Sequence, residues 1–232
     1  MLGSLKIPTG CASLDSILNG GFPQGLLSLI YGEAGTGKTS LVIQCSVNCV
    51  KLGFKVLFVD CDGTFTAERL LQIAKYDLNE IAPEITIIRP EKFEQQSKLI
   101  DHIEDYVYGK VKLVIFDTIT GLYRIELAEK NSFSLNRELS RQVATLANLA
   151  VKRNISVIVV SQVRAAMKEK ETLLGVEPVA NRVLKYWSKV IMALRHTGQP
   201  RIRRAILEKY PGKTKPSACY IRVSEDGIID VT

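Results

Sequence analysis

The sequence is poor in the residues that build metal clusters and disulfide frameworks. Its 232 residues include five cysteines, two histidines and one tryptophan, and no two cysteines form a CxxC pair. A structural zinc site needs four Cys or His ligands at close spacing, so the sequence argues against one. Cys45 and Cys49 lie four positions apart, on one face of a predicted helix. We expect both to be small buried apolar residues.

Long apolar runs are also missing. The longest, at residues 111–116 and 155–160, are far shorter than the stretch of about 20 residues that a membrane-spanning helix needs. The chain starts with MLGSLK, which lacks a basic segment followed by an apolar one, so nothing marks it for export. We therefore expect a cytoplasmic protein with no membrane partner.

The overall composition is ordinary, but acidic residues are scarce between residues 195 and 215. The net charge is +7, and between residues 195 and 215 the one acid is Glu208. The basic residues of this stretch are Arg195, Arg201, Arg203, Arg204, Lys209, Lys213 and Lys215. Such a concentration of charge predicts a phosphate partner, either a nucleotide or a nucleic-acid backbone. A solvated basic face is the alternative.

Short apolar runs and helical patterns alternate along most of the chain. We predict buried strands at residues 26–31, 56–60, 85–89, 111–117 and 155–161. We predict helices at residues 38–52, 66–76, 93–108 and 135–152. Closely spaced strands follow at residues 189–195, 202–209, 219–223 and 228–231. No linker composition divides the chain, so residues 1–232 should form one α/β domain, with a mainly parallel twisted sheet flanked by helices and an antiparallel C-terminal extension.

Residues 32–39 read GEAGTGKT, which fits the phosphate-loop pattern GxxxxGK[ST] between a predicted strand and a predicted helix. The predicted nucleotide ligands are Gly32, Glu33, Ala34, Gly35, Thr36, Gly37, Lys38, Thr39 and the following Ser40. The backbone N–H groups would surround the β-phosphate, an exposed Lys38 would reach the β- and γ-phosphates, and the Thr39 hydroxyl would bind Mg²⁺. ATP and Mg²⁺ are therefore the expected cofactors.

Three further polar residues follow predicted strands. Asp117 ends an apolar strand, as a Walker B aspartate does when it organises the water shell of the metal. Asp62 and Gln162 follow strands that should lie beside it, and ligands bind at the carboxyl ends of strands in open α/β sheets. Asp62 would orient or deprotonate a water, and Gln162 would sense the γ-phosphate. A turn cap for Asp62 and a satisfied strand-end amide for Gln162 are the alternatives.

The order of these motifs resembles the RecA/RadA recombinases, and within them the archaeal RadB paralogues. The resemblance covers nearly the whole chain and implies a RecA-like P-loop NTPase core. It is carried by TGCASLD at residues 9–15, GGF at 20–22, the phosphate loop, VDCDGTF at 59–65 with Glu68 and Arg69, the Walker B strand, and SQV at 161–163. RadA-type proteins have an N-terminal domain and a linker that docks into the next subunit. Since the sequence starts at the core, we expect that route to self-polymerisation to be missing.

The resemblance also implies roles for single residues. Arg69 matches the arginine that packs on adenine, and Gln162 the glutamine that couples nucleotide state to the second DNA-binding loop. Asp62 stands where active recombinases have the glutamate that activates water, and its shorter side chain predicts weak hydrolysis. Lys209 matches the region from which a lysine reaches a neighbouring subunit's nucleotide in trans.

The two DNA-binding loops of the family would fall at residues 123–136 and 164–180. The predicted DNA-binding residues lie in these loops or directly after them and are Arg124, Arg137, Arg164, Lys168 and Lys170. Neither loop is rich in aromatic residues, so we expect contacts to the DNA backbone, with a marked dependence on salt.

These features predict an ATP-binding and DNA-binding protein of homologous recombination and DNA repair. It would bind single-stranded or branched DNA and a RadA-like recombinase, hydrolyse ATP weakly and exchange no strands itself; association with further copies of the chain stays open. One alternative is an efficient DNA-stimulated strand-exchange ATPase, and another is a KaiC-like signalling ATPase without a DNA role. A small-molecule kinase fits less well, since no Arg-rich lid segment lies between the phosphate loop and the Walker B strand.

Overall fold

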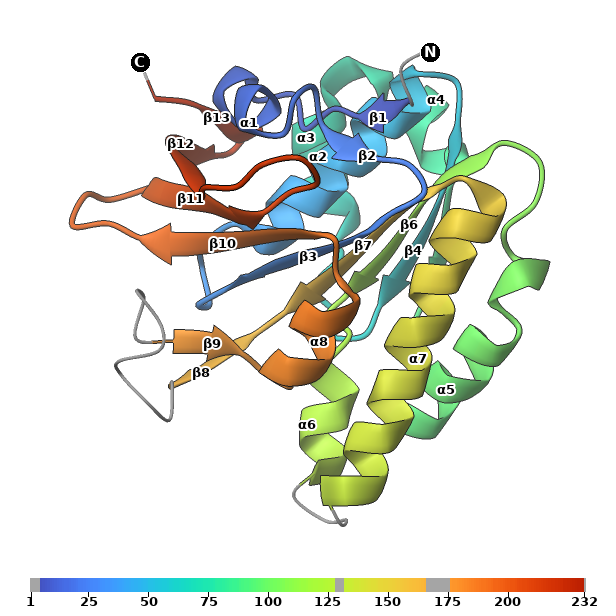
Figure 1. The fold of residues 1–232 in the computed structure, drawn as a ribbon. Helices are drawn as coiled ribbons and strands as arrows, with labels where there is room; N and C mark the ends of the chain where they lie inside the picture. Colours follow the sequence, from blue (N-terminus) through green and yellow to red (C-terminus); the bar gives the residue numbers. More distant parts are fainter. Residues whose placement is uncertain (1–4, 128–131, 166–175, 232) are drawn as a thin grey trace.

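The structure is a computed structural model that describes residues 5–127, 132–165 and 176–231 (Figure 1). The helices in these ranges are α1 (Ala12–Ile17), α2 (Lys38–Lys51), α3 (Ala67–Ala74), α4 (Leu78–Ile81), α5 (Phe93–Asp101), α6 (Gly121–Leu127), α7 (Ser132–Arg153) and α8 (Asn181–Trp187). The strands are β1 (Lys6–Ile7), β2 (Phe22–Pro23), β3 (Leu27–Gly32), β4 (Lys55–Asp60), β5 (Ile85–Ile88), β6 (Val111–Asp117), β7 (Ser156–Ser161), β8 (Val163–Ala165), β9 (Val176–Pro178), β10 (Val190–His196), β11 (Ile202–Lys209), β12 (Ser217–Ser224) and β13 (Gly227–Asp230).

Nine of the described strands form one sheet in the order β13-β12-β11-β10-β3-β7-β6-β4-β5. The six strands from β10 to β5 are parallel, and β11, β12 and β13 continue the sheet antiparallel. The predicted fold class is therefore correct, with one correction at its boundary. We expected the antiparallel extension to begin at residue 189, but β10 pairs parallel with β3, because α8 supplies a crossover that the sequence pattern did not reveal.

Side chains of the central strands alternate between two cores, one on each face of the sheet. In β3, Ile30 packs with α1 to α4, whereas Leu29 and Tyr31 pack with α5 to α8. β3 and β7 are buried along their whole length, as expected of parallel strands covered by helices on both sides. The sheet thus lies between two helical layers (Figure 1).

Two predicted helices are shorter than expected. α3 ends at Ala74, where Lys75 has a positive φ of 57°, and a 3₁₀ turn follows at Lys75–Asp77. α5 ends at Asp101 and is followed by a separate 3₁₀ turn at Ile103–Asp105. Cys45 and Cys49 are buried, as predicted. Within the described ranges, no helix is long and apolar enough to cross a membrane.

The parallel strands bring four predicted site segments to one edge of the sheet. β4 and β7 both pair with β6, so the chain after Asp60 and the chain after Ser161 flank Asp117. β3 lies on the other side of β7 and leads into the phosphate loop. This arrangement follows from strand direction, since carboxyl ends of parallel strands share one edge.

Candidate nucleotide-binding site

The phosphate loop leaves β3 at Gly32 and enters α2 at Lys38. Two of its glycines are required by close contacts. A Cβ at Gly32 would overlap the backbone carbonyl of Leu194 in β10. Gly37 has a φ of 93°, and a Cβ there would lie 2.9 Å from Val223 Cγ2 in β12. The loop is therefore shaped against the C-terminal strands of the same chain.

Lys38 is buried, with 9% of its surface exposed, which corrects our expectation of an exposed loop lysine. Its Nζ donates a 2.8 Å hydrogen bond to the Glu33 carbonyl across the loop. Burial lowers the pKa of Lys38, and the nearby charges of Asp117 and Asp62 partly oppose that shift. The ammonium group is thus held at the centre of the loop, next to the site carboxylates.

The hairpin of β10 and β11 supports the loop from outside, a contact that the sequence did not predict. His196 Nε2 lies 2.9 Å from the Ala34 carbonyl. Arg203 donates from Nε and Nη2 to the Gly35 carbonyl at 3.3 and 3.2 Å. Two consecutive carbonyls of the loop are therefore fixed by side chains. Arg203 belongs to the basic stretch at residues 195–215, so at least one of these positive side chains binds the phosphate loop of its own chain.

Asp117 ends β6 as predicted and is 1% exposed. Burial raises its pKa to about 6, while a hydrogen bond from Thr39 has the opposite effect. Among the described residues, none forms a hydrogen bond with Asp117 Oδ2. A buried carboxylate oxygen without a partner, next to a threonine hydroxyl, suits a hard cation or its water shell. Thr39 and Asp117 therefore fit the predicted Mg²⁺.

Asp62 and Gln162 lie together beside this carboxylate. Gln162 Nε2 donates to Asp62 Oδ2 at 2.9 Å, and Thr118 Oγ1 lies 3.1 Å from each Asp62 oxygen. Arg124 in α6 donates to Gln162 Oε1. Two hydrogen bonds thus connect Arg124, a predicted DNA-binding residue, through Gln162 to Asp62, the predicted water-activating carboxylate.

The turn after β4 is capped by Asp60 and not by Asp62. Asp60 accepts hydrogen bonds from the backbone N–H groups of Thr64 at 2.9 Å and Phe65 at 3.2 Å. Its Oδ2 also accepts from Arg89 Nε at 3.0 Å. Asp60 therefore has the turn-capping role that we considered as the alternative for Asp62, and the Asp62 carboxylate accepts a hydrogen bond from Gln162 instead.

Arg69 joins the phosphate-loop helix to the turn between β12 and β13. Its guanidinium donates to Ser40 Oγ at 2.9 and 3.1 Å, to the Ser224 carbonyl at 2.9 Å and to the Glu225 carbonyl at 2.7 Å. Ser40 and Arg69, both predicted nucleotide ligands, are thus adjacent. Packing of Arg69 on adenine stays a prediction.

The predicted DNA-binding residues are less concentrated. Arg137 lies exposed on α7, and Arg164 in β8 forms a 2.9 Å ion pair with Glu177 of β9. Lys168 and Lys170 lie outside the described residues. The first predicted loop is largely occupied by α6 and the start of α7. Among those predicted DNA-binding residues that the structure describes, Arg124 is the one with a hydrogen bond to the candidate site.

Lys209 lies at the opposite edge of the sheet from the phosphate loop. It pairs with Ile191 near the start of β10, and its Nζ donates to the Ser188 carbonyl at 2.8 Å. Burial, and then the charge of Lys189, lower its pKa. Any contact between Lys209 and a nucleotide would therefore involve the site of another subunit, and the trans role stays a prediction.

The Rad51 family model matches residues 3–231 of the chain. The chain belongs to the Rad51 family. Relatives include the DNA repair and recombination protein RadB of Methanococcoides burtonii, 36% identical over 224 residues that cover 96% of this chain and 97% of the relative. RadB of Thermococcus kodakarensis is 37% identical over 228 residues, covering 97% and 99%. A crystal structure of the RadB recombinase superposes with a TM-score of 0.83 at 34% identity, covering 97% of this chain and 100% of that one.

Membership of the Rad51 family confirms the resemblance that the motifs predicted and the RecA-like fold. The match spans the N-terminal TGCASLD motif, the phosphate loop, the Walker B strand and the C-terminal hairpins. Residue roles inside the site stay predictions, supported by the geometry described above.

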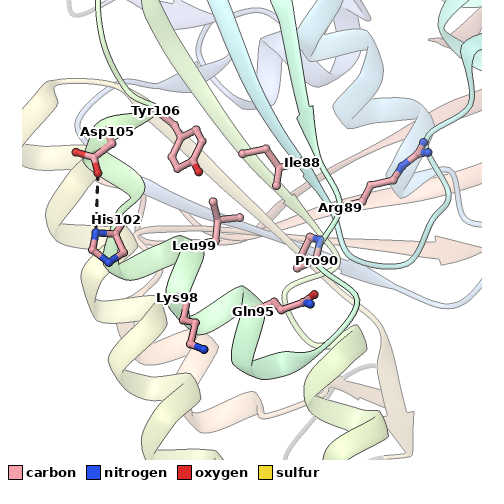
Figure 2. A pocket seen from close by; sticks show the side chains of 9 residues that line it. All are labelled: Ile88, Arg89, Pro90, Gln95, Lys98, Leu99, His102, Asp105 and Tyr106. Atoms are coloured by element: carbon pink, nitrogen blue, oxygen red, sulfur yellow. Dashed lines mark ion pairs between the residues drawn. The ribbon is translucent and has the colours of Figure 1, made fainter.

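The pocket drawn in Figure 2 lies away from these residues, between the end of β5 and α5. It has a volume of about 530 Å³ and is lined by Ile88, Arg89, Pro90, Gln95, Lys98, Leu99, His102, Asp105 and Tyr106. Arg89 connects it to the candidate site, because it pairs with Asp60. The lining contains none of the predicted nucleotide ligands.

Proposed function

We propose that this chain binds ATP with Mg²⁺ at the phosphate loop, hydrolyses it slowly, and acts in DNA recombination and repair beside a RadA-like recombinase. The observation that carries the nucleotide site is the buried Asp117 carboxylate next to Lys38 and Thr39, with an oxygen that lacks a hydrogen-bond partner in the described part of the chain. The printed names of the relatives, which are DNA repair and recombination proteins, support the cellular role.

The loop residues would bind and orient the triphosphate. Backbone N–H groups of the loop and the N-terminus of α2 would bind the β-phosphate, and Lys38 would supply a positive charge at the β- and γ-phosphates. Mg²⁺, when bound, would neutralise charge on the phosphate oxygens, and Thr39 and Asp117 would hold it. Ser40 and Arg69 would border the nucleoside.

Asp62 would orient the attacking water, and Gln162 would hold Asp62. Both Asp62 oxygens already accept from Thr118, and one also accepts from Gln162. An aspartate carboxylate held back in this way reaches less far than a glutamate, which supports slow hydrolysis. Since Arg124 contacts Gln162, DNA bound at Arg124 would alter the contact that orients Asp62.

DNA contacts would come from Arg124, Arg137, Arg164, Lys168 and Lys170, which we assign to the backbone of single-stranded or branched DNA. We infer no strand exchange by this chain alone. Association with a recombinase or with further copies of the chain would place Lys209 at a neighbour's nucleotide.

The nucleotide site is tested by Lys38→Ala, with Lys110→Ala as a charge-matched control at an exposed turn. We expect Lys38→Ala to abolish Mg·ATP binding in calorimetry, because the lysine would supply its charge to the phosphates. The variant should stay folded by circular dichroism, because burial disfavours the charged form of Lys38 and the charge therefore does not stabilise the fold. Lys110→Ala should bind ATP like the wild type. Unchanged ATP affinity in folded Lys38→Ala protein would contradict the proposal that the phosphate loop is the nucleotide-binding site.

The rival functions are separated by three measurements. Fast ATP turnover that rises with single-stranded DNA would favour a strand-exchange enzyme. No gel shift at any salt concentration would favour a signalling ATPase without a DNA role. Retention of a RadA-like recombinase on the immobilised chain would support the mediator role, and its absence would remove that partner.

A further inference from the structure

The antiparallel extension has one face that does not join the core beside α2. Side chains alternate along β11 and β12, and Ala205, Leu207 and Ile221 are buried in that core. Arg204, Tyr220 and Arg222 therefore point to the other face of the sheet. Arg204 is exposed and Tyr220 is 55% exposed.

Positive charges stand together on this face. Arg204 lies directly opposite Arg195 of β10 on one side and Tyr220 on the other. Arg222 is the diagonal neighbour of Arg204, at a typical Cα separation of about 7–8 Å. Arg204 and Arg222 are like charges on neighbouring strands, and an anionic partner between them would relieve their repulsion.

Glu208, the acid nearest in sequence to Arg204, does not neutralise this face. Glu208 accepts from Tyr31 OH at 2.7 Å and pairs with Lys185 at 2.9 Å. The residues opposite Arg222 are Ile202 and Ile229, both apolar. Cross-strand neighbours of Arg204 and Arg222 in the described strands therefore include no carboxylate.

A depression of about 370 Å³ lies at the end of this face. It is lined by Gln199, Pro200, Arg201, Ile202, Arg222, Val223 and Ser224, with no acid among these described residues. Arg201 has a φ of 59°, in the left-handed region where Gly or Asn is favoured in a tight turn. Arg201 thus occupies a turn position whose backbone conformation is unfavourable for arginine, and it lines the depression together with Arg222.

We propose that the face formed by Arg201, Arg204, Tyr220 and Arg222 binds the backbone of a single nucleic-acid strand, with Tyr220 stacked on a base. Guanidinium groups fit phosphate oxygens in a two-pronged geometry, and an exposed ring between arginines is the platform that single strands use. An acidic protein segment would also complement the arginine charges, but it would not use the exposed Tyr220 ring for base stacking. The inference rests on the proposed DNA role but concerns a surface separate from Arg124 and Arg164.

The experiment measures fluorescence anisotropy of a labelled oligothymidylate at several salt concentrations. We expect Arg204→Ala/Arg222→Ala to weaken binding and to reduce the slope of log K against log salt by about 1.4, since each lost contact to a single strand removes roughly 0.7. The control is Lys92→Ala/Lys110→Ala, which removes two positive charges from other exposed sites and should bind like the wild type.

Tyr220 gives an independent readout. Tyr220→Ala should weaken binding about fivefold or more without changing the salt slope, and Tyr220→Phe should restore it, because stacking needs the ring and not the hydroxyl. If wild-type protein binds no oligonucleotide, the proposed DNA role fails together with this face. If the wild type binds and the arginine and lysine double variants behave alike, the face alone is overturned.

Discussion

At the scale of single residues, the Asp62 carboxylate lies between donors from two neighbouring strand ends. Thr118 and Gln162 hold it, and a Cβ at Gly121 would overlap Asp62 Oδ1. The glycine at the start of α6 therefore leaves the room that this carboxylate occupies. Its position depends on packing between β4, β6 and β7.

We expect Asp62→Glu to raise the rate of ATP hydrolysis, by up to about 10²-fold, because one more methylene extends the carboxylate towards the γ-phosphate. Phosphate release measured with and without single-stranded DNA provides the test. Asp62→Asn is the control, since it keeps the size and removes the base. A wild-type rate of about 1 s⁻¹ or faster would contradict our interpretation of Asp62.

A second prediction concerns the stability of the protein without nucleotide. Burial raises the pKa of Asp117 from 3.8 to about 6, so the ionised carboxylate destabilises the fold above that pH. Asp117→Asn should therefore increase the free energy of unfolding by up to about 3 kcal/mol above pH 6, and the gain should vanish as the pH falls towards the unfolded pKa of about 4.

Urea unfolding at neutral and acidic pH measures this difference. The same variant should lose the part of its ATP affinity that depends on Mg²⁺, because it replaces the carboxylate that has an oxygen without a hydrogen-bond partner among the described residues. Asp117→Asn protein that is less stable than the wild type at every pH would contradict this prediction, because it would show that interactions of the ionised carboxylate outweigh the cost of its burial.

The phosphate loop, Asp117, Asp62 and Gln162 share one property, which is that each lies at or just after the end of a strand. The loop, Asp117, Asp62 and Gln162 could be placed from strand order alone. His196 and Arg203 could not, since they reach the loop from strands distant in sequence. Asp60, the actual turn cap, was indistinguishable from Asp62 by spacing.

At the scale of elements, the six-residue helix α1 depends on the last strand. Cys11 precedes it without a side-chain cap, and Asp230 of β13 accepts from the backbone N–H groups of Ala12 at 3.0 Å and Ser13 at 2.7 Å. A carboxylate at a helix N-terminus also interacts favourably with the helix dipole. The first helix and the last strand are therefore joined by one side chain.

Asp230→Ala should lower the free energy of unfolding by roughly 0.5–2 kcal/mol, the usual cost of a lost N-cap. Hydrogen bonds from Ser13 lower the pKa of Asp230 to about 2, so this stability is present above the unfolded pKa of about 4 and is lost as the pH falls through about 2. Thermal unfolding at neutral and acidic pH measures it. Asp226→Ala is the control, because Asp226 forms an exposed pair with Lys75 that should contribute little. Equal effects of the two substitutions would show that Asp230 does not stabilise α1 as a cap.

The sequence predicted the four longest helices and the strands of the main sheet. All nine predicted strands occur in the main sheet, with ends shifted by one or two residues in most cases. The unpredicted helices α1, α4, α6 and α8 have four to seven residues, too few for a helical period to stand out. β8 and β9 form a separate two-stranded sheet of three residues each, inside what appeared to be a loop.

At the scale of the whole molecule, the two ends of β11 serve different regions. Arg203 contacts the phosphate loop at one edge of the sheet, and Lys209 lies towards the opposite edge. A subunit that stacks its Lys209 edge on the phosphate-loop edge of the next would bring the lysine to the nucleotide. Such a head-to-tail arrangement is heterologous and propagates from subunit to subunit.

We expect Lys209→Ala to weaken ATP-dependent association with itself or with a RadA-like recombinase, while the ATP affinity of the monomer stays nearly unchanged. Light scattering and pull-down with and without ATP measure association, and calorimetry measures affinity. Lys213→Ala is a suitable control, since Lys213 donates to the Ile17 carbonyl of its own chain. If association does not respond to ATP in either protein, the trans role should be abandoned.

The contacts of the phosphate loop also set the order in which the protein becomes competent during its own synthesis. Residues 32–39 leave the ribosome early, but Gly37 packs against Val223 and Ile228, and Gln44 in α2 bonds the backbone of Ile228 at 2.6 and 3.0 Å. A nascent chain that lacks β12 and β13 has the complete loop sequence without the surface that shapes it. We therefore expect ATP to bind ribosome-bound chains only after β13 has emerged, so that an interrupted translation product would not sequester nucleotide.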